Sequence, residues 1–420
     1  MRLIPGNRRL EIRLLGVTLA VMTLLGGTRQ AAGQGLPSEP ISVAGGRLVI
    51  SGEATASAAP EDTGYFNASD YGQNALRHLS LGVTTGLSLG DRVSFLSEIR
   101  AEYGQRLGVY AAFVRVRPWA RRPIDLQVGR IPPTFGAFAR RGYGVGNPLI
   151  GQPLAYQYLT SLRTDALPAS ADDLLRMRAR GWRPSYPIGA ETRHTGVPLV
   201  SAQRWDTGVQ VRVGDRRVRV VGAVTTGSLS NPLVRDDNGG KQFAFRAGLH
   251  PSASLTFGVS GARADFVSRA ALAALPSEAT RHRTQNGLGV DAEYSRDHWL
   301  VRVEGVLSSW RLPVVAAPFG GQPLRAVALT AEAQYKLRPG LYVAGRVDRI
   351  GFSSIEGTLF EGRPTPWDAP VSRLELGGGY YVRRNVIAKV TYQHNWRDSE
   401  RDQSRQPRIR FVAAQVLYWF

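Results

Sequence analysis

The 420-residue sequence contains no cysteine. Disulfide bonds, thiolate metal sites and an acylated amino-terminal cysteine are therefore excluded. Histidine is scarce as well, and the six histidines are scattered without the spacing of metal ligands. We therefore expect no metal site and no cofactor. The fold must be held together by backbone hydrogen bonds and by packing.

Long apolar runs are also missing. No stretch of about 18 apolar residues occurs, which excludes a helical membrane protein. The first segment has a basic start, a short apolar run over 14–25 and the small residues Ala31-Ala32-Gly33. This order predicts a secretory signal peptide over 1–33, followed by a lead-in over 34–45. The apolar run is too short to act as a membrane anchor, because spanning the hydrocarbon takes about 20 residues.

Lysine is nearly absent, and arginine carries the positive charge. Lysine occurs only at Lys241, Lys336 and Lys389, so 53 − 3 = 50 of the cationic side chains are arginines, and the formal net charge is +20. An exported chain does not normally meet nucleic acid, so we expect no nucleic-acid partner. The partners that fit this charge are anionic lipid headgroups and anionic solutes.

The sequence after the lead-in repeats one pattern, about ten residues of alternating polarity followed by a break. In 76–89, for example, Leu79, Leu81 and Val83 share one face, and Ser80 and Thr84 share the other. The pattern predicts sixteen strands, at 46–58, 76–89, 92–103, 108–117, 123–131, 204–213, 217–227, 241–250, 254–264, 286–295, 299–309, 325–337, 341–352, 371–383, 385–396 and 408–420.

The breaks alternate in length. Tight turns such as Gly90-Asp91 and Arg383-Arg384 alternate with longer connections, of which 132–203 is the longest and Gly104 to Leu107 the only short one. This separation is typical of transmembrane barrels, whose tight turns lie on the periplasmic rim and whose long loops lie outside. A soluble β-sandwich has no reason to separate its loops in this way. In lipid, only a closed sheet satisfies the backbone of its strands. We therefore predict an all-β, antiparallel transmembrane barrel over 46–420.

The last predicted strand ends on aromatic residues. It resembles the carboxy-terminal signature of Gram-negative outer-membrane proteins, carried here by Val412, Ala414, Val416, Tyr418 and Phe420. The resemblance implies recognition by the barrel-assembly machinery. We expect this strand to close on the first strand near Leu48 and Ile50, with Phe420 facing lipid at the periplasmic rim.

Sixteen strands with a long third outward connection resemble the porin superfamily of the Gram-negative outer membrane. The stretch Val128 to Gly136 is similar to the passage that leads into a porin's constriction loop. The resemblance implies an outer-membrane location, a channel and a homotrimer. The arginine-rich loop is similar to that of the anion- or phosphate-selective branch.

The connection over 132–203 is too long to be idle and is rich in aromatic residues. We expect it to fold inward as a constriction loop, with a short helix capped by Ser170 and ending before Gly181. Guanidinium groups at a constriction favour phosphate or carboxylate solutes. Alternatively, these arginines pair with acidic wall residues and hold the loop in place. The candidates are Arg140, Arg141, Arg163, Arg176, Arg178, Arg180 and Arg183.

The polar face of the predicted strands carries charges of both signs. Acidic and basic positions are interspersed, so we expect ion pairs across the wall and a polar, water-filled interior. The candidate lumen-wall residues are Glu98, Arg100, Arg115, Arg212, Arg246, Asp291, Glu293, Arg302, Glu304, Glu332, Arg346, Asp348, Arg373 and Lys389.

Together these features predict a channel for passive diffusion of small hydrophilic solutes, with a preference for anions. No serine–histidine pair can be singled out, so we do not expect an enzyme. The competing function is a barrel without an open pore, which serves as an outer-membrane scaffold or adhesion surface through its long loops.

Overall fold

The computed structural model describes residues 37–68, 74–77, 79–102, 107–137, 142–201, 205–276, 282–313, 322–398 and 408–420. Ser38–Phe420 form one compact unit. The predicted signal peptide lies outside the described residues, as does the first part of the lead-in.

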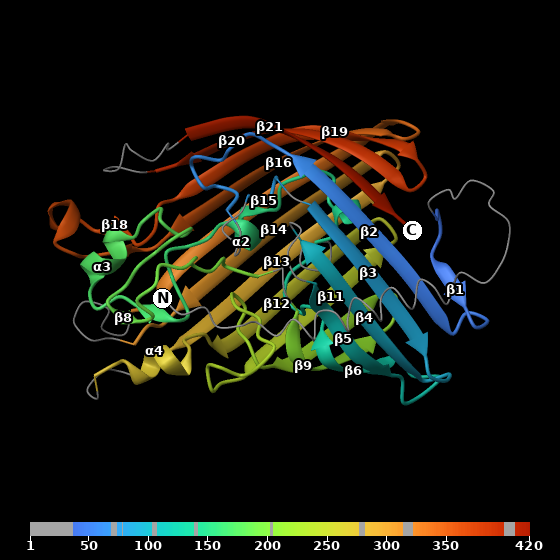
Figure 1. Ribbon diagram of the computed structural model, residues 1–420, viewed down its shortest axis with the longest axis horizontal. Coiled ribbons are helices and arrows are strands. Elements are labelled where there is room, and N and C mark those ends of the chain that lie inside the picture. Colours follow the sequence, from blue (N-terminus) through green and yellow to red (C-terminus); the bar gives the residue numbers. More distant parts are fainter. Residues whose placement is uncertain are drawn as a thin grey trace, which may run out of the picture. The chain divides into compact units, whose positions relative to one another are not determined.

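The unit is built from long strands that run obliquely around a barrel (Figure 1). Apolar and polar residues alternate along each strand, so each strand can bury one face and expose the other. The strands of the barrel are β2 (Leu48–Ala58), β3 (Leu79–Ser88), β4 (Val93–Glu102), β5 (Gly108–Val116), β6 (Ile124–Ile131), β9 (Asp206–Gly214), β10 (Val218–Thr225), β11 (Gln242–Ser252), β12 (Leu255–Asp265), β13 (Thr284–Arg296), β14 (Trp299–Trp310), β15 (Leu324–Arg338), β16 (Leu341–Phe352), β19 (Val371–Arg383), β20 (Val386–Arg397) and β21 (Arg408–Trp419).

The sheet is antiparallel and closed. It contains 17 strands, of which β1 (Ile41–Val43) pairs only with β2, so 17 − 1 = 16 strands form the barrel. Strand β2 pairs with β3 on one edge and with β21 on the other, which closes the ring. Each predicted segment overlaps one of these strands, with ends that differ by a few residues, so the predicted fold class and strand number are confirmed.

The point of closure differs from the expectation. Strand β21 meets β2 at Glu53 to Ala58, and Phe420 exchanges backbone hydrogen bonds with Gly52 at 3.0 and 3.1 Å. Leu48 and Ile50, the expected partners, pair with β1 instead. The physical reason is a hairpin: the chain turns at Ala44 to Gly46, all at positive φ, and β1 occupies this part of the β2 edge.

The outward face of the barrel is apolar. Large aliphatic side chains on the outward positions are about half exposed, while their neighbours along each strand point inward and are mostly buried. A surface of this kind fits the hydrocarbon of a bilayer. Among the most exposed are Leu81 at 56%, Val290 at 56%, Leu329 at 59%, Val347 at 54%, Val390 at 55% and Val416 at 53%.

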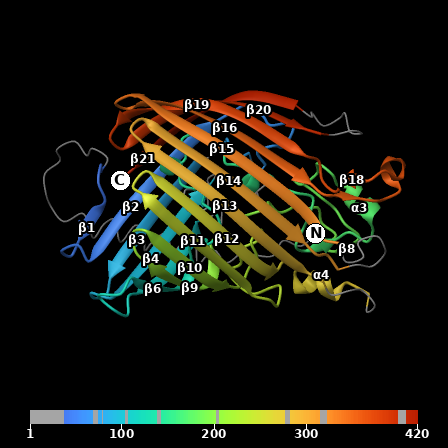
Figure 2. The same cartoon turned by 180° about the vertical axis from the view of Figure 1, so that it is seen from behind.

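The two ends of the barrel differ. The long connections gather at one end, called the outer end here, together with α3 (Ala171–Arg176), α4 (Arg269–Ala273) and β18 (Thr365–Pro366), and β1 lies at the other, inner end (Figures 1 and 2). The remaining short elements are η2 (Gly144–Gly146), α2 (Leu154–Gln157), β7 (Ala166–Leu167), β8 (Ile188–Gly189), β17 (Ser354–Ile355) and η3 (Leu359–Gly362).

The predicted helix of the long connection is present but shorter. Ser170 caps α3 by accepting a hydrogen bond from the Asp173 backbone N–H at 3.2 Å. The helix ends at Arg176 with Met177 as its C-cap, and the chain enters the left-handed region further on, at Ala179. No described helix is long and apolar enough to cross a membrane.

Candidate pore lining

The third outer connection folds into the barrel. Its first part lies against lumenal side chains: the backbone N–H of Ala137 donates to Glu304 at 2.8 Å, and the Tyr143 hydroxyl donates to Glu98 at 2.6 Å. Further along, α2 contacts β15 and β16. The connection therefore narrows the lumen from within.

Basic wall residues hold this part of the connection. Lys389 Nζ donates to the carbonyl oxygens of Gly144 and Asn147, both at 2.6 Å. The Arg346 guanidinium donates to the carbonyl of Gly151 at 2.6 Å, and Arg302 donates to that of Gly146 at 3.3 Å. These contacts join wall cations to carbonyl groups of the connection, and the wall carboxylates Glu98 and Glu304 accept from a tyrosine hydroxyl and a backbone N–H. One alternative from the sequence was instead that arginines of the connection pair with wall carboxylates.

Buried charges behind these contacts form a network. Arg346 is 1% exposed and pairs with Glu332 at 3.1 Å, with Asp348 at 3.2 Å and with Glu375 at 2.5 Å. Arg373, which is fully buried, donates to Asn395 at 2.6 Å and to the carbonyl of Gln152 at 3.0 Å. These wall charges are therefore used to fix the connection.

The predicted lumen-wall residues all lie on the inward face of their strands. Most of them are brought together in ion pairs, such as Arg246 with Asp291 and Arg302 with Glu293 at 3.0 Å. Arg100 contacts Glu98 and lies over the Tyr143 ring, 4.7 Å from its centroid. Asp125, which is not among the predicted wall residues, pairs with Arg115 at 2.6 Å. The alternation of polarity in 124–131 could have identified Asp125, because it puts this residue on the polar face with Gln127.

The candidate arginines of the connection have a different place. Arg140 and Arg141 lie outside the described residues. Arg163 is buried within the connection and binds Asp165 at 2.8 Å together with the carbonyls of Pro184 and Thr192. Arg176 pairs with Asp173 in α3.

Arg178 and Arg180 follow α3. The Arg178 guanidinium lies 5.1 Å from the centre of the Phe360 ring, in the neighbouring outer connection. Arg180 is partly buried and Arg183 is exposed. These positions belong to the part of the connection that packs against the other outer connections, beyond the segment that the lumenal wall holds.

This outer part of the connection is a folded layer. Its buried apolar residues join Phe66, Phe266, Trp310 and Trp367 in the largest hydrophobic cluster of the described chain. Asp368 is buried and accepts backbone hydrogen bonds from Ser161 at 2.7 Å and Ala179 at 2.8 Å. Burial raises the pKa of the Asp368 carboxyl.

A surface carboxylate links the same layer to η3. The Thr358 hydroxyl donates to Asp172, and so do the backbone N–H groups of Thr358 at 2.8 Å and Leu359 at 3.0 Å. These hydrogen bonds, the hydroxyl first, lower the pKa of Asp172. The contact ties α3 to the connection that carries β17 and β18.

The wall from β5 to β11 carries arginines that do not hold the connection. Arg212 on β9 and Arg219 on β10 make no hydrogen bond or ion pair with another described residue. Arg115 shares Asp125 with Arg117, and its side chain is 36% exposed. Register places Arg212 opposite Asp125 on one neighbour and opposite Val221 on the other. A row of guanidinium groups therefore faces the lumen.

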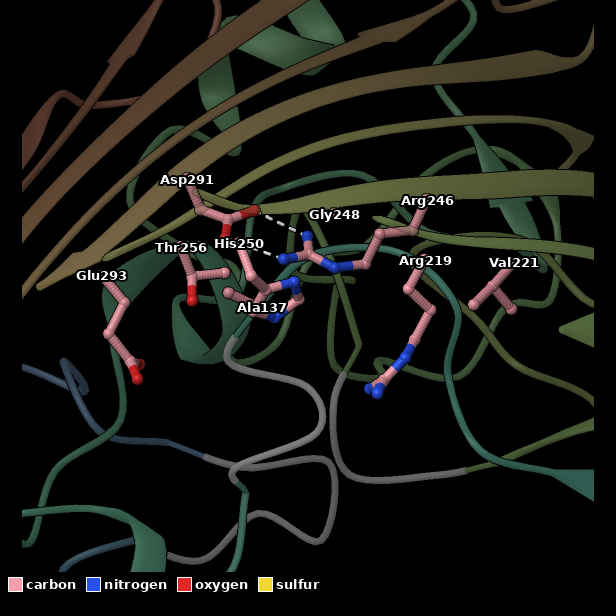
Figure 3. A pocket seen from close by; sticks show the side chains of 9 residues that line it. All are labelled: Ala137, Arg219, Val221, Arg246, Gly248, His250, Thr256, Asp291 and Glu293. Atoms are coloured by element: carbon pink, nitrogen blue, oxygen red, sulfur yellow. Dashed lines mark hydrogen bonds and ion pairs between the residues drawn. The ribbon is translucent and has the colours of Figure 1, made fainter. Parts of the chain in front are cut away.

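A cavity of about 240 Å³ opens beside this row. Arg246 and Asp291 meet in its wall through two contacts, at 2.6 and 2.7 Å, while Arg219 and Glu293 extend away from the wall on either side of that pair (Figure 3). Ala137, from the inward connection, also lines the cavity. The cavity thus lies between the inward connection and the β10–β13 wall.

The sequence matches no protein-family model. It also matches no curated protein.

Solved structures share the architecture at low sequence identity. OmpT, an outer membrane protein of Vibrio cholerae, has a TM-score of 0.52 and 10% identity, over 89% of this chain and 98% of that chain. The anion-selective porin from Comamonas acidovorans has a TM-score of 0.54 and 7% identity, over 89% and 99%. OmpF of Salmonella typhi, solved with daunomycin, has a TM-score of 0.51 and 14% identity, over 91% and 100%. The barrel is closed by sixteen antiparallel strands and has an apolar outer face, which agrees with this structural likeness. The chain has the fold of the outer-membrane porin superfamily.

Proposed function

We propose that this protein is a porin, a non-enzymatic, water-filled channel through which small hydrophilic solutes diffuse. The observation that carries the proposal is the cavity beside the inward connection, lined by charged side chains inside a barrel whose outer face is apolar. Charged lumenal groups that are not all paired favour water over dry packing.

The location we propose is the outer membrane of a Gram-negative-type bacterium. The predicted signal peptide and the carboxy-terminal signature support export and delivery to the barrel-assembly machinery. Val412 and Val416 of that signature face outward, and the Tyr418 and Phe420 rings lie 6.1 Å apart at the closure. Assembly as a homotrimer belongs to the same proposal, supported by the porin fold alone.

We base the proposed preference for anions on the arginines of the lumenal wall, in place of the arginines of the connection. Arg115, Arg117, Arg212, Arg219 and Arg246 lie on β5 to β11 or the turn beside them. Asp125 pairs with Arg115 and Arg117, and Asp291 pairs with Arg246, whereas Arg212 and Arg219 make no ion pair with another described residue. Arginine binds phosphate and carboxylate oxygens in a bidentate geometry. A solute that carries such a group would be favoured at this wall.

Single-channel recording tests the proposal. The purified protein should give discrete conductance steps in planar bilayers, and a salt gradient should give a reversal potential of the sign for anions. A folded protein that produces no steps would refute the channel. A cation-selective reversal potential would refute the anion preference and leave the channel standing.

A second candidate is a closed barrel that serves as a scaffold or adhesion surface. The folded layer of outer connections favours it, because its buried core around Trp310 and Trp367 covers part of the outer end. Swelling of liposomes in small sugars separates the two candidates. A channel admits the sugar and the vesicles swell, whereas a closed barrel gives no change.

A further inference from the structure

The outward face of the barrel is apolar except at the outer ends of a few strands. On β16, β20 and β21 this face carries Arg349, His394, Trp396, Arg408 and Arg410, a set we name the outer basic patch. The three arginines are exposed and make no ion pair with another described residue. No channel function requires cations on a surface that faces away from the lumen.

The register of the paired strands brings the residues of the outer basic patch together. His394 lies directly opposite Arg410, and Trp396 lies directly opposite Arg408. Directly paired residues of antiparallel strands point to the same face, with Cβ atoms about 5 Å apart. The rings of His394 and Trp396 lie 5.2 Å apart. Arg408 and Arg410 are two residues apart on one strand, which separates them by about 7 Å.

The same row continues to Arg349. Trp396 lies opposite Ser372 on β19, and Ser372 lies opposite Arg349 on β16. Three strand spacings separate Arg349 from Arg408, a lateral distance of about 14 Å. The patch therefore offers two cationic points, Arg408 with Arg410 at one end and Arg349 at the other, with an indole between them.

The surroundings of the patch point to a lipid. No acidic residue occupies an outward position on the described parts of β16, β19, β20 and β21. Toward the inner end, the same face continues with Leu376, Val390 and Val412, which are 48%, 55% and 52% exposed. Phosphates fit the guanidinium groups and acyl chains fit the aliphatic surface beneath them.

We propose that the outer basic patch binds a phosphorylated glycolipid of the outer leaflet that carries two phosphates on one headgroup, as lipid A does. Arg408 and Arg410 hold one phosphate, Arg349 holds the other, and Trp396 lies at the headgroup level between them. The inference rests on the proposed outer-membrane location, and it adds a lipid site on the outside of the barrel. Two separated cationic points distinguish this partner from a lipid with a single phosphate.

Binding to the purified, detergent-solubilised barrel tests the site. Native mass spectrometry would compare bisphosphorylated lipid A, monophosphoryl lipid A and phosphatidylglycerol on the wild type and on Arg349→Gln/Arg408→Gln/Arg410→Gln. The wild type should prefer the bisphosphorylated lipid, and the triple variant should lose affinity for it by on the order of tenfold to a hundredfold. The matched control is Arg216→Gln/Arg217→Gln/Arg383→Gln, which removes three exposed arginines at the inner end and should bind as the wild type does.

Two results would overturn the inference: equal binding of all three lipids by the wild type, or an unchanged affinity in the triple variant. A triple variant that alters the oligomeric state and leaves lipid binding intact would assign the patch to contacts between copies and would also refute it. The channel proposal is tested separately, because the triple variant should conduct as the wild type does. A protein that binds the lipid and does not conduct refutes only the channel.

Discussion

At the scale of single residues, the arginines of the barrel fall into two classes. Arg346 and Arg373 are buried among carboxylates, amides and carbonyls, and hold the inward connection. Arg212 and Arg219 face the lumen without such partners. Both classes lie at polar positions of alternating strands, so the difference between them comes from what each side chain meets across the barrel.

This division predicts the effect of neutralisation on selectivity. Arg212→Gln/Arg219→Gln should shift the reversal potential towards zero or to the sign for cations, because two unpaired positive charges leave the lumenal wall. Measurement in planar bilayers under a salt gradient checks it. Arg216→Gln/Arg217→Gln, in the exposed turn at the inner end, is the control and should shift the potential much less. An equal shift in both double variants would show that general surface charge sets the selectivity.

At the scale of elements, helix α3 and η3 are coupled through Asp172. The hydrogen bonds from Thr358 and Leu359 lower the pKa of Asp172, so the ionised form is favoured in the folded state. A lowered folded-state pKa gives stability that is present above the unfolded value of about 3.9 and is lost as pH falls through the folded value. The coupling should therefore be intact at neutral pH, begin to weaken as pH falls below about 4, and be lost once pH is below the lowered folded-state pKa.

Amide hydrogen exchange, corrected for intrinsic rates, measures this coupling. Protection of the Thr358 and Leu359 amides should decline in acid in the wild type, whereas Asp172→Ala, which removes the acceptor oxygen, should show low protection at every pH. Asp165→Ala, in the same connection but hydrogen-bonded to Arg163, serves as the control and should leave these two amides protected at neutral pH. Protection in the wild type that does not depend on pH would contradict the role of Asp172.

At the scale of the whole molecule, the apolar outer face predicts that the barrel sits in a bilayer. Val290→Arg, near the middle of β13 and 56% exposed, should lower the free energy of unfolding in lipid vesicles by about 2–4 kcal/mol, because the charge faces hydrocarbon. Thr256→Arg places the same charge beside the lumenal cavity, and we expect it to lower the free energy of unfolding much less. Unfolding of both variants by guanidinium in lipid vesicles measures the two losses in the free energy of unfolding. Equal losses would mean that the outer face does not contact lipid.

Much of the architecture could be predicted from the sequence. The alternation of polarity is a local property, since successive side chains of a strand point to opposite faces whatever they pair with. All sixteen strands were therefore found with small errors at their ends, and the Ser170 cap was found because it acts within one helical turn. The inward path of the connection was predicted from its length and its resemblance to porins, and its lumenal contacts agree with that path.

Only the tertiary structure decided how the charges are used. Lys389 meets the carbonyls of Gly144 and Asn147 across more than 240 positions of the chain, and the Glu53 carboxylate accepts a hydrogen bond from the Gly144 backbone N–H at 3.3 Å. The place of closure, at Gly52, depended on a hairpin that competes for the same strand edge. By itself, the sequence determined a closed barrel of sixteen strands with one polar face, because that information is carried locally by every strand. Which arginines are locked into the wall and which face the open lumen was decided by register and closure, since ion pairs depend on distances between residues that are remote in the chain.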